Sequence, residues 1–124
     1  MKILVTGGCG FIGSNFIIHM LGQYPDLNIT NLDLLTYAGN LENLKSVESS
    51  PRYRFAKGDI TDSEIVRLLA SEKPDVIVNF AAESHVDRSI IDPSAFIKTN
   101  ILGVQVLLDA CREFNIPRFV QISS

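Results

Sequence analysis

The sequence lacks the features that would place it in a membrane, on a nucleic acid or in a disulfide-bonded fold. Its two cysteines, Cys9 and Cys111, form no CxxC pattern, which favours a reducing compartment. No stretch reaches the roughly 18 consecutive apolar residues of a membrane span. The formal net charge of -3 offers no basic footprint for nucleic acid. Because Met1-Lys2 leads directly into a predicted strand, no signal peptide is expected, and we expect a cytoplasmic protein.

The composition is that of one packed domain. Hydrophobic residues make up 46% of the 124 residues and charged residues 20%. A compact domain of this length buries roughly two-thirds of the surface of its unfolded chain. We therefore treat residues 1–124 as a single domain, in which no cluster of His, Cys and acidic residues predicts a metal site.

Apolar runs and helical spacings alternate along the chain. Runs bounded by Gly, Pro or Asp predict strands at 2–6, 28–33, 53–57, 75–79 and 118–122. Helical spacing predicts helices at 11–23, 61–71 and 93–114, and the loop from 34 to 43 leads into a short helix ending near Val47. Thr61 with Glu64 has the spacing of a capping box. The alternation predicts an α/β fold, a doubly wound parallel sheet of Rossmann type with strand order 3-2-1-4-5.

A glycine-rich turn follows the first strand. Gly7, Gly10 and Gly13 recur every third residue between a predicted strand and a predicted helix. Glycine allows a tight turn and a close approach to a pyrophosphate, and the helix that follows directs its free N–H groups at the anion. This context favours dinucleotide binding, although the glycines could also serve only to make the turn.

Asp33 closes the second predicted strand, about 20 residues beyond this turn, where a dinucleotide-binding fold places the acid that holds the adenosine ribose. No arginine adjoins Asp33 to accommodate a 2′-phosphate, so the pattern favours NAD over NADP. The alternative is that Asp33 is simply an exposed acid at a strand end.

Five segments give the chain a family resemblance. They are TGGCGFIGSNF at 6–16, LTYAGNLENL at 35–44, GDI at 58–60, NFAAESHVDRSI at 79–90 and KTNILGV at 98–104. With them the chain resembles the extended short-chain dehydrogenase/reductase family, and within it the dTDP-glucose 4,6-dehydratases, over essentially its whole length. One departure is Leu34, which stands where these enzymes usually have Lys.

The resemblance implies a set of NAD-binding residues at the carboxyl end of the sheet. These are Gly7, Gly10, Phe11, Ile12, Gly13, Asp33, Leu35, Thr36, Ala38, Gly39, Asp59, Ile60, Ala81, Ala82 and Thr99. The glycine turn would line the pyrophosphate, residues 33–39 the adenosine, and residues 59–60 the adenine ring. Residues 81, 82 and 99 would approach the nicotinamide-side ribose. Ser84 would reach the sugar substrate, and Ser124 matches the position of the family's catalytic hydroxyl residue.

The resemblance also implies an activity for a longer protein. Such an enzyme converts dTDP-glucose to dTDP-4-keto-6-deoxyglucose by internal hydride transfer through NAD and loss of water. Its catalytic Tyr-x-x-x-Lys would follow Ser124, so we expect this chain to lack that motif and to be the NAD-binding part, truncated after the fifth strand and inactive alone. Two alternatives stay open: another nucleotide-sugar epimerase, dehydratase or decarboxylase of the family, and a non-catalytic NAD-binding sensor module.

Other conspicuous residues have plainer interpretations. His85 is more simply a residue that orients its loop than a catalytic base, and Cys9 is a small residue that fits a tight turn. The predicted helix at 93–114 is apolar on more than one face, so one face is expected to need a partner. The resemblance implies that this partner is the same helix of a second subunit, in a homodimer.

Overall fold

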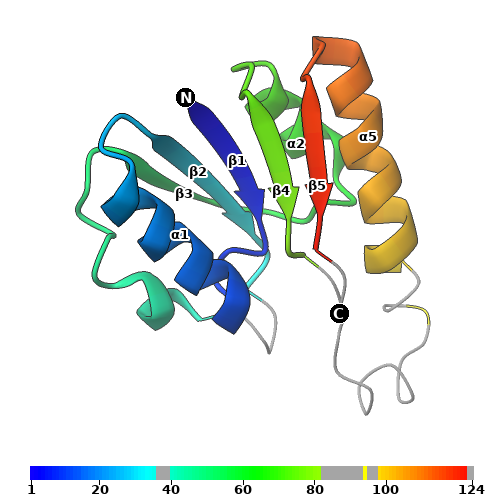
Figure 1. Ribbon diagram of the computed structural model, residues 1–124. Helices are drawn as coiled ribbons and strands as arrows, with labels where there is room; N and C mark the ends of the chain where they lie inside the picture. Colours follow the sequence, from blue (N-terminus) through cyan, green and yellow to red (C-terminus); the bar gives the residue numbers. More distant parts are fainter. Residues whose placement is uncertain (36–39, 82–93, 95–97, 123–124) are drawn as a thin grey trace.

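The computed structural model describes residues 1–35, 40–81, 94 and 98–122, which form a five-stranded parallel sheet. The strands are β1 Lys2–Thr6, β2 Asn28–Asp33, β3 Tyr53–Lys57, β4 Val76–Asn79 and β5 Arg118–Gln121. Their order across the sheet is β3-β2-β1-β4-β5 (Figure 1). The predicted fold class and strand order are therefore confirmed.

Helices cover the sheet on both faces (Figure 1). Helix α1, Phe11–Gln23, lies on one face with the 3-10 turn η1, Leu41–Leu44. Helices α2, Ser63–Ala70, and α5, Gly103–Phe114, lie on the other face and pack against each other. A π-helical turn η2, Lys98–Leu102, leads into α5. No helix within these described ranges is long and apolar enough to cross a membrane.

The two faces carry separate hydrophobic cores, because successive strand residues point to opposite sides. Leu4 and Leu32 face α2 and α5, where they pack with Val66, Leu69, Ile77 and Leu107. Val5 and Ile29 face α1, where they pack with Ile17, Leu21 and Leu44. The strands alternate between two buried sides, which fixes their register.

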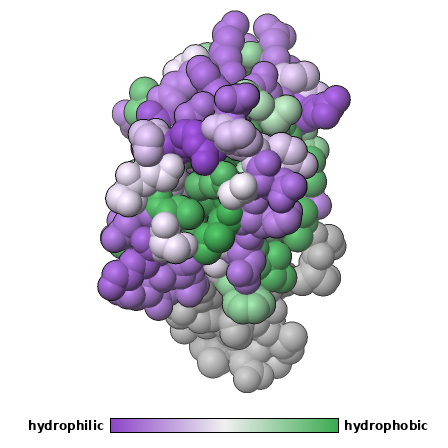
Figure 2. All heavy atoms as spheres, turned by 60° about the vertical axis from the view of Figure 1, so that its left-hand side comes forward, coloured by the Kyte–Doolittle hydropathy of each residue, from purple (hydrophilic) through white to green (hydrophobic). Residues whose placement is uncertain are grey.

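The edge of the sheet at β3 is less covered. Tyr53, Phe55 and Ala56 are only partly buried. Figure 2, which brings this side of the molecule forward, shows apolar side chains at the surface within a largely hydrophilic face.

The predicted start of the second helix is wrong. The capping box at Thr61 does not form: Asp62 caps α2 by accepting from the Glu64 N–H at 3.0 Å. The Thr61 N–H is instead taken by the Asp59 carboxylate at 2.9 Å, in a turn that ends before the helix begins.

The helix predicted at 93–114 is also not uniform, because residues 98–102 form a π-helical turn. Just after it, a Cβ on Gly103 would lie 2.3 Å from Ile60 Cδ1. The wider turn therefore directly precedes the point where this helix packs against Ile60, in the segment that follows β3.

Candidate functional site

The glycine turn lies at the carboxyl end of β1, and Gly7 and Gly13 occupy positions that exclude a side chain. Gly7 has φ +74°, and a Cβ there would lie 2.5 Å from the backbone nitrogen of Ala81. A Cβ on Gly13 would lie 2.6 Å from the Gly7 carbonyl oxygen. The turn is therefore clamped between β4 and the first turn of α1, and the predicted residues Gly7, Gly13 and Ala81 lie together.

The first turn of α1 presents free backbone donors. Its N-cap, Gly10, is extended and offers no side-chain cap. The first helical N–H with an intrahelical acceptor is that of Ser14, which bonds to the Gly10 carbonyl at 2.9 Å. Among the residues that the structure describes, no acceptor outside the helix is recorded for the N–H groups of residues 11–13, and they lie at the positive end of the helix dipole, where an anion can bind. The side chains of Phe11 and Ile12 are 79% and 63% exposed there.

The Asp33 carboxylate sits directly beside the turn. Its Oδ2 accepts from the Cys9 N–H and its Oδ1 from the Leu35 N–H, each at 2.8 Å. Leu35 itself has φ +60°, in the left-handed region. Asp33 is 8% exposed. A carboxylate has about four acceptor positions, so the bonds from these two N–H groups do not use all of them.

Asn31 on β2 also holds the turn, and the sequence analysis did not single it out. Its Oδ1 accepts from the Gly8 N–H at 2.9 Å, and its Nδ2 contacts Cys9 Sγ at 3.4 Å and the Tyr53 hydroxyl at 3.2 Å. Together with Asp33 it binds two consecutive N–H groups of the turn to β2. Asn31 is fully buried, so a polar residue on an inward strand position was the available clue.

Cys9 is a structural residue of the turn. Its carbonyl accepts from the Asn40 N–H at 3.1 Å and from Asn43 Nδ2 at 2.9 Å, which ties η1 to the turn. Burial, with the nearby Asp33 charge, raises the pKa of the Cys9 thiol to about 12. A thiol that stays protonated near neutral pH is a poor nucleophile, in agreement with the plain interpretation of Cys9.

A second polar network ties together the ends of β1, β4 and β5. The Thr6 hydroxyl donates to Asn79 Oδ1, which also accepts from the Ala81 N–H at 3.0 Å. Asn79 Nδ2 donates to Gln121 Oε1 at 2.7 Å. Thr6 and Asn79 are fully buried. The network fixes Ala81 against Gly7, and the sequence analysis missed it.

The predicted adenine contacts lie at the end of β3. Asp59 Oδ1 accepts from the Thr61 N–H, so its carboxylate shapes the turn that follows the strand. Ile60 is 4% exposed and packs in the core against Gly103. The structure thus brings both residues to the same edge of the sheet as Asp33.

The remaining predicted residues are not described, or only in part. Thr99 lies in η2, and its side chain is not described. The following lie outside the described residues: Thr36, Ala38, Gly39, Ala82, Ser84, His85 and Ser124.

A Tyr-x-x-x-Lys spacing does occur within the chain, at Tyr53 and Lys57, but on the strand β3. On a helix, residues four apart lie about 5–6 Å from each other, whereas four strand residues span about 13 Å. Tyr53 and Lys57 therefore do not form a catalytic Tyr-Lys pair of the family type. Burial raises the pKa of Tyr53, which further keeps its hydroxyl protonated.

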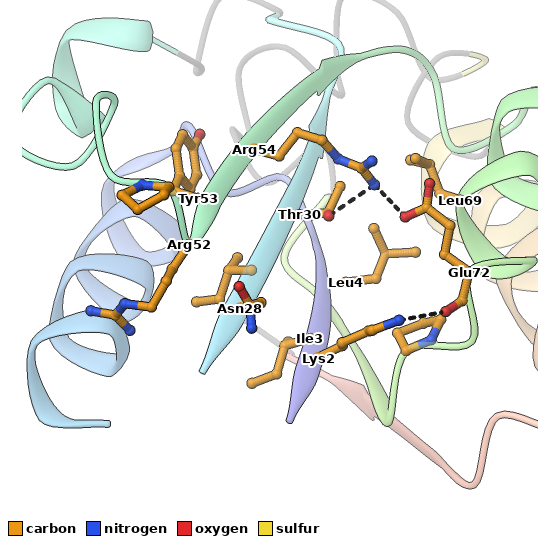
Figure 3. A pocket seen from close by; sticks show the side chains of 13 residues that line it. Lys2, Ile3, Leu4, Asn28, Thr30, Arg52, Tyr53, Arg54, Leu69 and Glu72 are labelled. Carbon is orange, nitrogen blue, oxygen red and sulfur yellow. Dashed lines mark hydrogen bonds and ion pairs between the residues drawn. The ribbon is translucent and has the colours of Figure 1, made fainter. Parts of the chain in front are cut away.

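A pocket of about 250 Å³ opens at the opposite, amino end of the strands (Figure 3). Its cations already have partners. Arg54 bonds to Thr30 and Glu72, and Lys2 Nζ donates to the Glu72 carbonyl at 3.2 Å. Arg52 donates to three carbonyls between the last turn of α1 and the start of β2. The cations of this pocket therefore serve to join secondary structure elements. The N–H groups and the acid that suit a dinucleotide lie instead at the carboxyl end of the strands.

The described residues contain no group of three or more His, Cys, Asp or Glu side chains that could hold a metal ion. The carboxyl edge combines a tight glycine turn, the N–H groups at the start of α1 and a buried acid. This combination fits a pyrophosphate joined to a ribose with free hydroxyls.

Comparison with known proteins agrees with this geometry. The family model described as GDP-mannose 4,6 dehydratase matches residues 4–124. The low-salt glycan biosynthesis protein Agl12 of Haloferax volcanii is 52% identical over 124 residues, covering 100% of this chain and 39% of the relative. A dTDP-glucose 4,6-dehydratase of Streptomyces griseus is 50% identical, covering 98% of this chain and 37% of the relative.

A solved structure gives the same result. The dTDP-glucose 4,6-dehydratase DesIV of Streptomyces venezuelae, a double mutant with NAD and DAU bound, superposes with a TM-score of 0.94 at 48% identity. The match covers 100% of this chain and 39% of that one. The chain thus spans under two-fifths of the length of these relatives. The chain belongs to the GDP-mannose 4,6-dehydratase family, and the resemblance seen in the sequence is confirmed.

Proposed function

We propose that this member of the GDP-mannose 4,6-dehydratase family is the NAD-binding part of a nucleotide-sugar 4,6-dehydratase. The observation that carries the proposal is the Asp33 carboxylate, held beside the glycine turn by the N–H groups of Cys9 and Leu35. The NAD bound in the Streptomyces venezuelae relative supports the choice of cofactor.

The residues present fit NAD. The pyrophosphate would bind the free N–H groups of residues 11–13, close to the backbone that Gly7 and Gly13 keep clear of side chains. The adenosine ribose would donate its hydroxyls to Asp33, and the adenine would lie near Asp59. When bound, NAD supplies reversible hydride transfer. The contribution of this chain is to bind and orient it, and Ala81 at the end of β4 would border its nicotinamide side.

The substrate of the longer enzyme would be a nucleotide sugar, with dTDP-glucose favoured by the relatives of this name. Ser84 and Ser124 remain the proposed contacts of the chain with the sugar. The reacting groups of the elimination would come from residues beyond those of this chain, so we expect the chain alone to bind NAD without turning over the sugar.

The subunit contact would use α5 and the turn before it. Ile101, Leu102 and Leu108 are 61%, 51% and 44% exposed. Exposed apolar residues gathered along one helix favour a protein partner, and we propose a second copy of the protein, in a homodimer. Two free cysteines and a nucleotide-sugar substrate fit the cytoplasm as its compartment.

Calorimetric titration with NAD, and separately with NADP, tests the cofactor assignment. We expect NAD to bind more tightly than NADP. Replacing Asp33 with Asn keeps an acceptor for the Cys9 N–H but removes the charge, and hydrogen bonds to charged groups contribute about 1.5–3 kcal/mol. NAD binding should therefore weaken about 10- to 100-fold.

Asp26→Asn is the matched control, because Asp26 is an exposed acid beyond the far end of α1. It should leave NAD affinity unchanged. A folded protein that binds no NAD, or binds it equally well with Asn at position 33, would contradict the proposal. Equal loss in both variants would do so as well.

A further inference from the structure

We propose that Lys57 is a second determinant of cofactor selectivity, a cation beside Asp33 that favours a 2′-phosphate and limits the discrimination against NADP. This inference rests on the proposed NAD site and concerns how strictly that site selects its dinucleotide. The sequence around Asp33 showed no such cation, because Lys57 is distant in the chain and meets Asp33 only across the sheet.

Sheet register brings Lys57 next to Asp33. The two residues are paired across β2 and β3 at the carboxyl end of both strands. The Gly58 N–H donates to the Asp33 carbonyl at 3.1 Å, which continues the pairing beyond the last strand residues. Neighbouring strands lie about 5 Å apart, so the stem of Lys57 starts one strand spacing from the acid.

Both side chains lie on the same face. Tyr53 and Phe55 pack into the core on the α1 side, and strand residues two apart share a face. Lys57 therefore also lies on the α1 side. Asp33 is on that side too, because its carboxylate binds the glycine turn there. The lysine and the acid thus flank the same space at the edge of the sheet.

Lys57 is available to a ligand. It is exposed, and the ion pairs recorded among the described residues join Arg54 with Glu72 and Arg67 with Glu113. A lysine side chain is a flexible point charge that can follow a phosphate. Arg54 is three positions earlier on the same strand, and therefore on the opposite face of the sheet. It is already bound to Thr30 and Glu72.

The charges around the space oppose each other. Asp33 and Asp59 are the anions nearest the proposed ribose position, and a 2′-phosphate would add about two further negative charges. Lys57 is the cation that partly offsets them. Removing it should weaken NADP binding more than NAD binding, since only NADP carries the extra phosphate.

The size of the effect follows from exposure. An ion pair between two solvent-exposed groups contributes little free energy. For a pair between Lys57 and a 2′-phosphate, this corresponds to a change of about two- to fivefold in the affinity for NADP. We therefore expect Lys57→Met to lower the affinity for NADP relative to NAD by about two- to fivefold. At 1 M salt, where the screening length is about 3 Å, the difference between the variant and the original protein should disappear.

The experiment is a paired calorimetric titration with NAD and NADP, at low and at high salt. Lys57→Arg should keep the original ratio of the NADP affinity to the NAD affinity, because arginine has the same positive charge. Lys73→Met is the matched control: it removes the same charge from an exposed lysine that precedes β4 at the amino end of the sheet. It should leave the ratio unchanged.

Each outcome decides a separate point. The inference is supported if the ratio of NADP to NAD affinity falls in Lys57→Met and stays at the original value in Lys57→Arg. At high salt the ratio should be the same in all three proteins. An unchanged ratio in a protein that still binds NAD overturns the inference and leaves the proposed function intact. An original protein that binds neither dinucleotide overturns the proposed function, and this inference with it.

Discussion

The position of Gly7 offers a strong test of how the turn is built. Gly7→Ala would place a Cβ 2.5 Å from the nitrogen of Ala81, 2.6 Å from its Cα and 2.7 Å from the carbonyl carbon of Phe80. These are backbone atoms, so no side chain can rotate away. The residue also keeps φ +74°, a conformation that costs a non-glycine residue about 1–2 kcal/mol.

The two costs add. Forcing a methyl group into a filled space costs about 1–3 kcal/mol, so Gly7→Ala should lower the free energy of unfolding by about 2–5 kcal/mol. Gly22→Ala is the matched control, because a Cβ on Gly22 in α1 meets nothing within 4 Å. It should raise stability by about 0.5–1 kcal/mol through better helix propensity.

Urea unfolding followed by circular dichroism measures both variants. The dependence of the unfolding free energy on urea should stay the same, which would show that the change lies in stability and not in compactness. A Gly7→Ala protein within about 0.5 kcal/mol of the original would refute the reasoning, since neither the clash nor the left-handed backbone would then be real.

Two further predictions concern the residues under the turn. Asn31→Leu should lower the free energy of unfolding in urea by about 1–3 kcal/mol, because the buried Gly8 N–H loses its acceptor. Asn28→Leu, at the exposed start of the same strand, should change this free energy little. Equal effects of the two substitutions would contradict the role of Asn31. Burial raises the pKa of Cys9 from 9.0 to about 12, so the unfolded chain loses this proton first as the pH rises above about 9, and the free energy of unfolding should fall by up to about 1.4 kcal/mol per pH unit. The fall between pH 9 and 10 should be smaller in Cys9→Ala, and an identical pH profile for the two proteins would count against the buried thiol.

The sheet could be predicted from the sequence because its strands alternate between two buried faces. The ranges 2–6, 28–33 and 53–57 agree with β1, β2 and β3, and the spacing over 11–23 agrees with α1. The ranges predicted for the last two strands of the chain, 75–79 and 118–122, are each one residue too long, since β4 begins at Val76 and β5 ends at Gln121. Apolar periodicity fixes which residues are inside, and only hydrogen bonding fixes where a strand stops.

The candidate site was predictable only where a motif marked it. The glycine spacing and Asp33 have local patterns, and the structure brings them together. Asn31 and Asn79 have none, because a polar residue in a strand becomes meaningful only once its partners across the sheet are known. Lys57 is hidden for the same reason. Asp62, and not Thr61, caps α2, and the Thr61 N–H is bonded to the Asp59 carboxylate in the turn before the helix. Helix propensities do not reveal such a bond.

Amide chemical shifts during an NAD titration test the central claim most directly, namely that the dinucleotide binds at the carboxyl end of the sheet. In a ¹⁵N-labelled protein, the amides of residues 11–13 and of Leu35 should shift on addition of NAD, because they adjoin the free helical donors and the Asp33 carboxylate. The amides of Lys2, Thr30 and Arg54, around the pocket at the amino end, should stay in place. Shifts confined to that pocket, or no shifts at the glycine turn, would contradict the account.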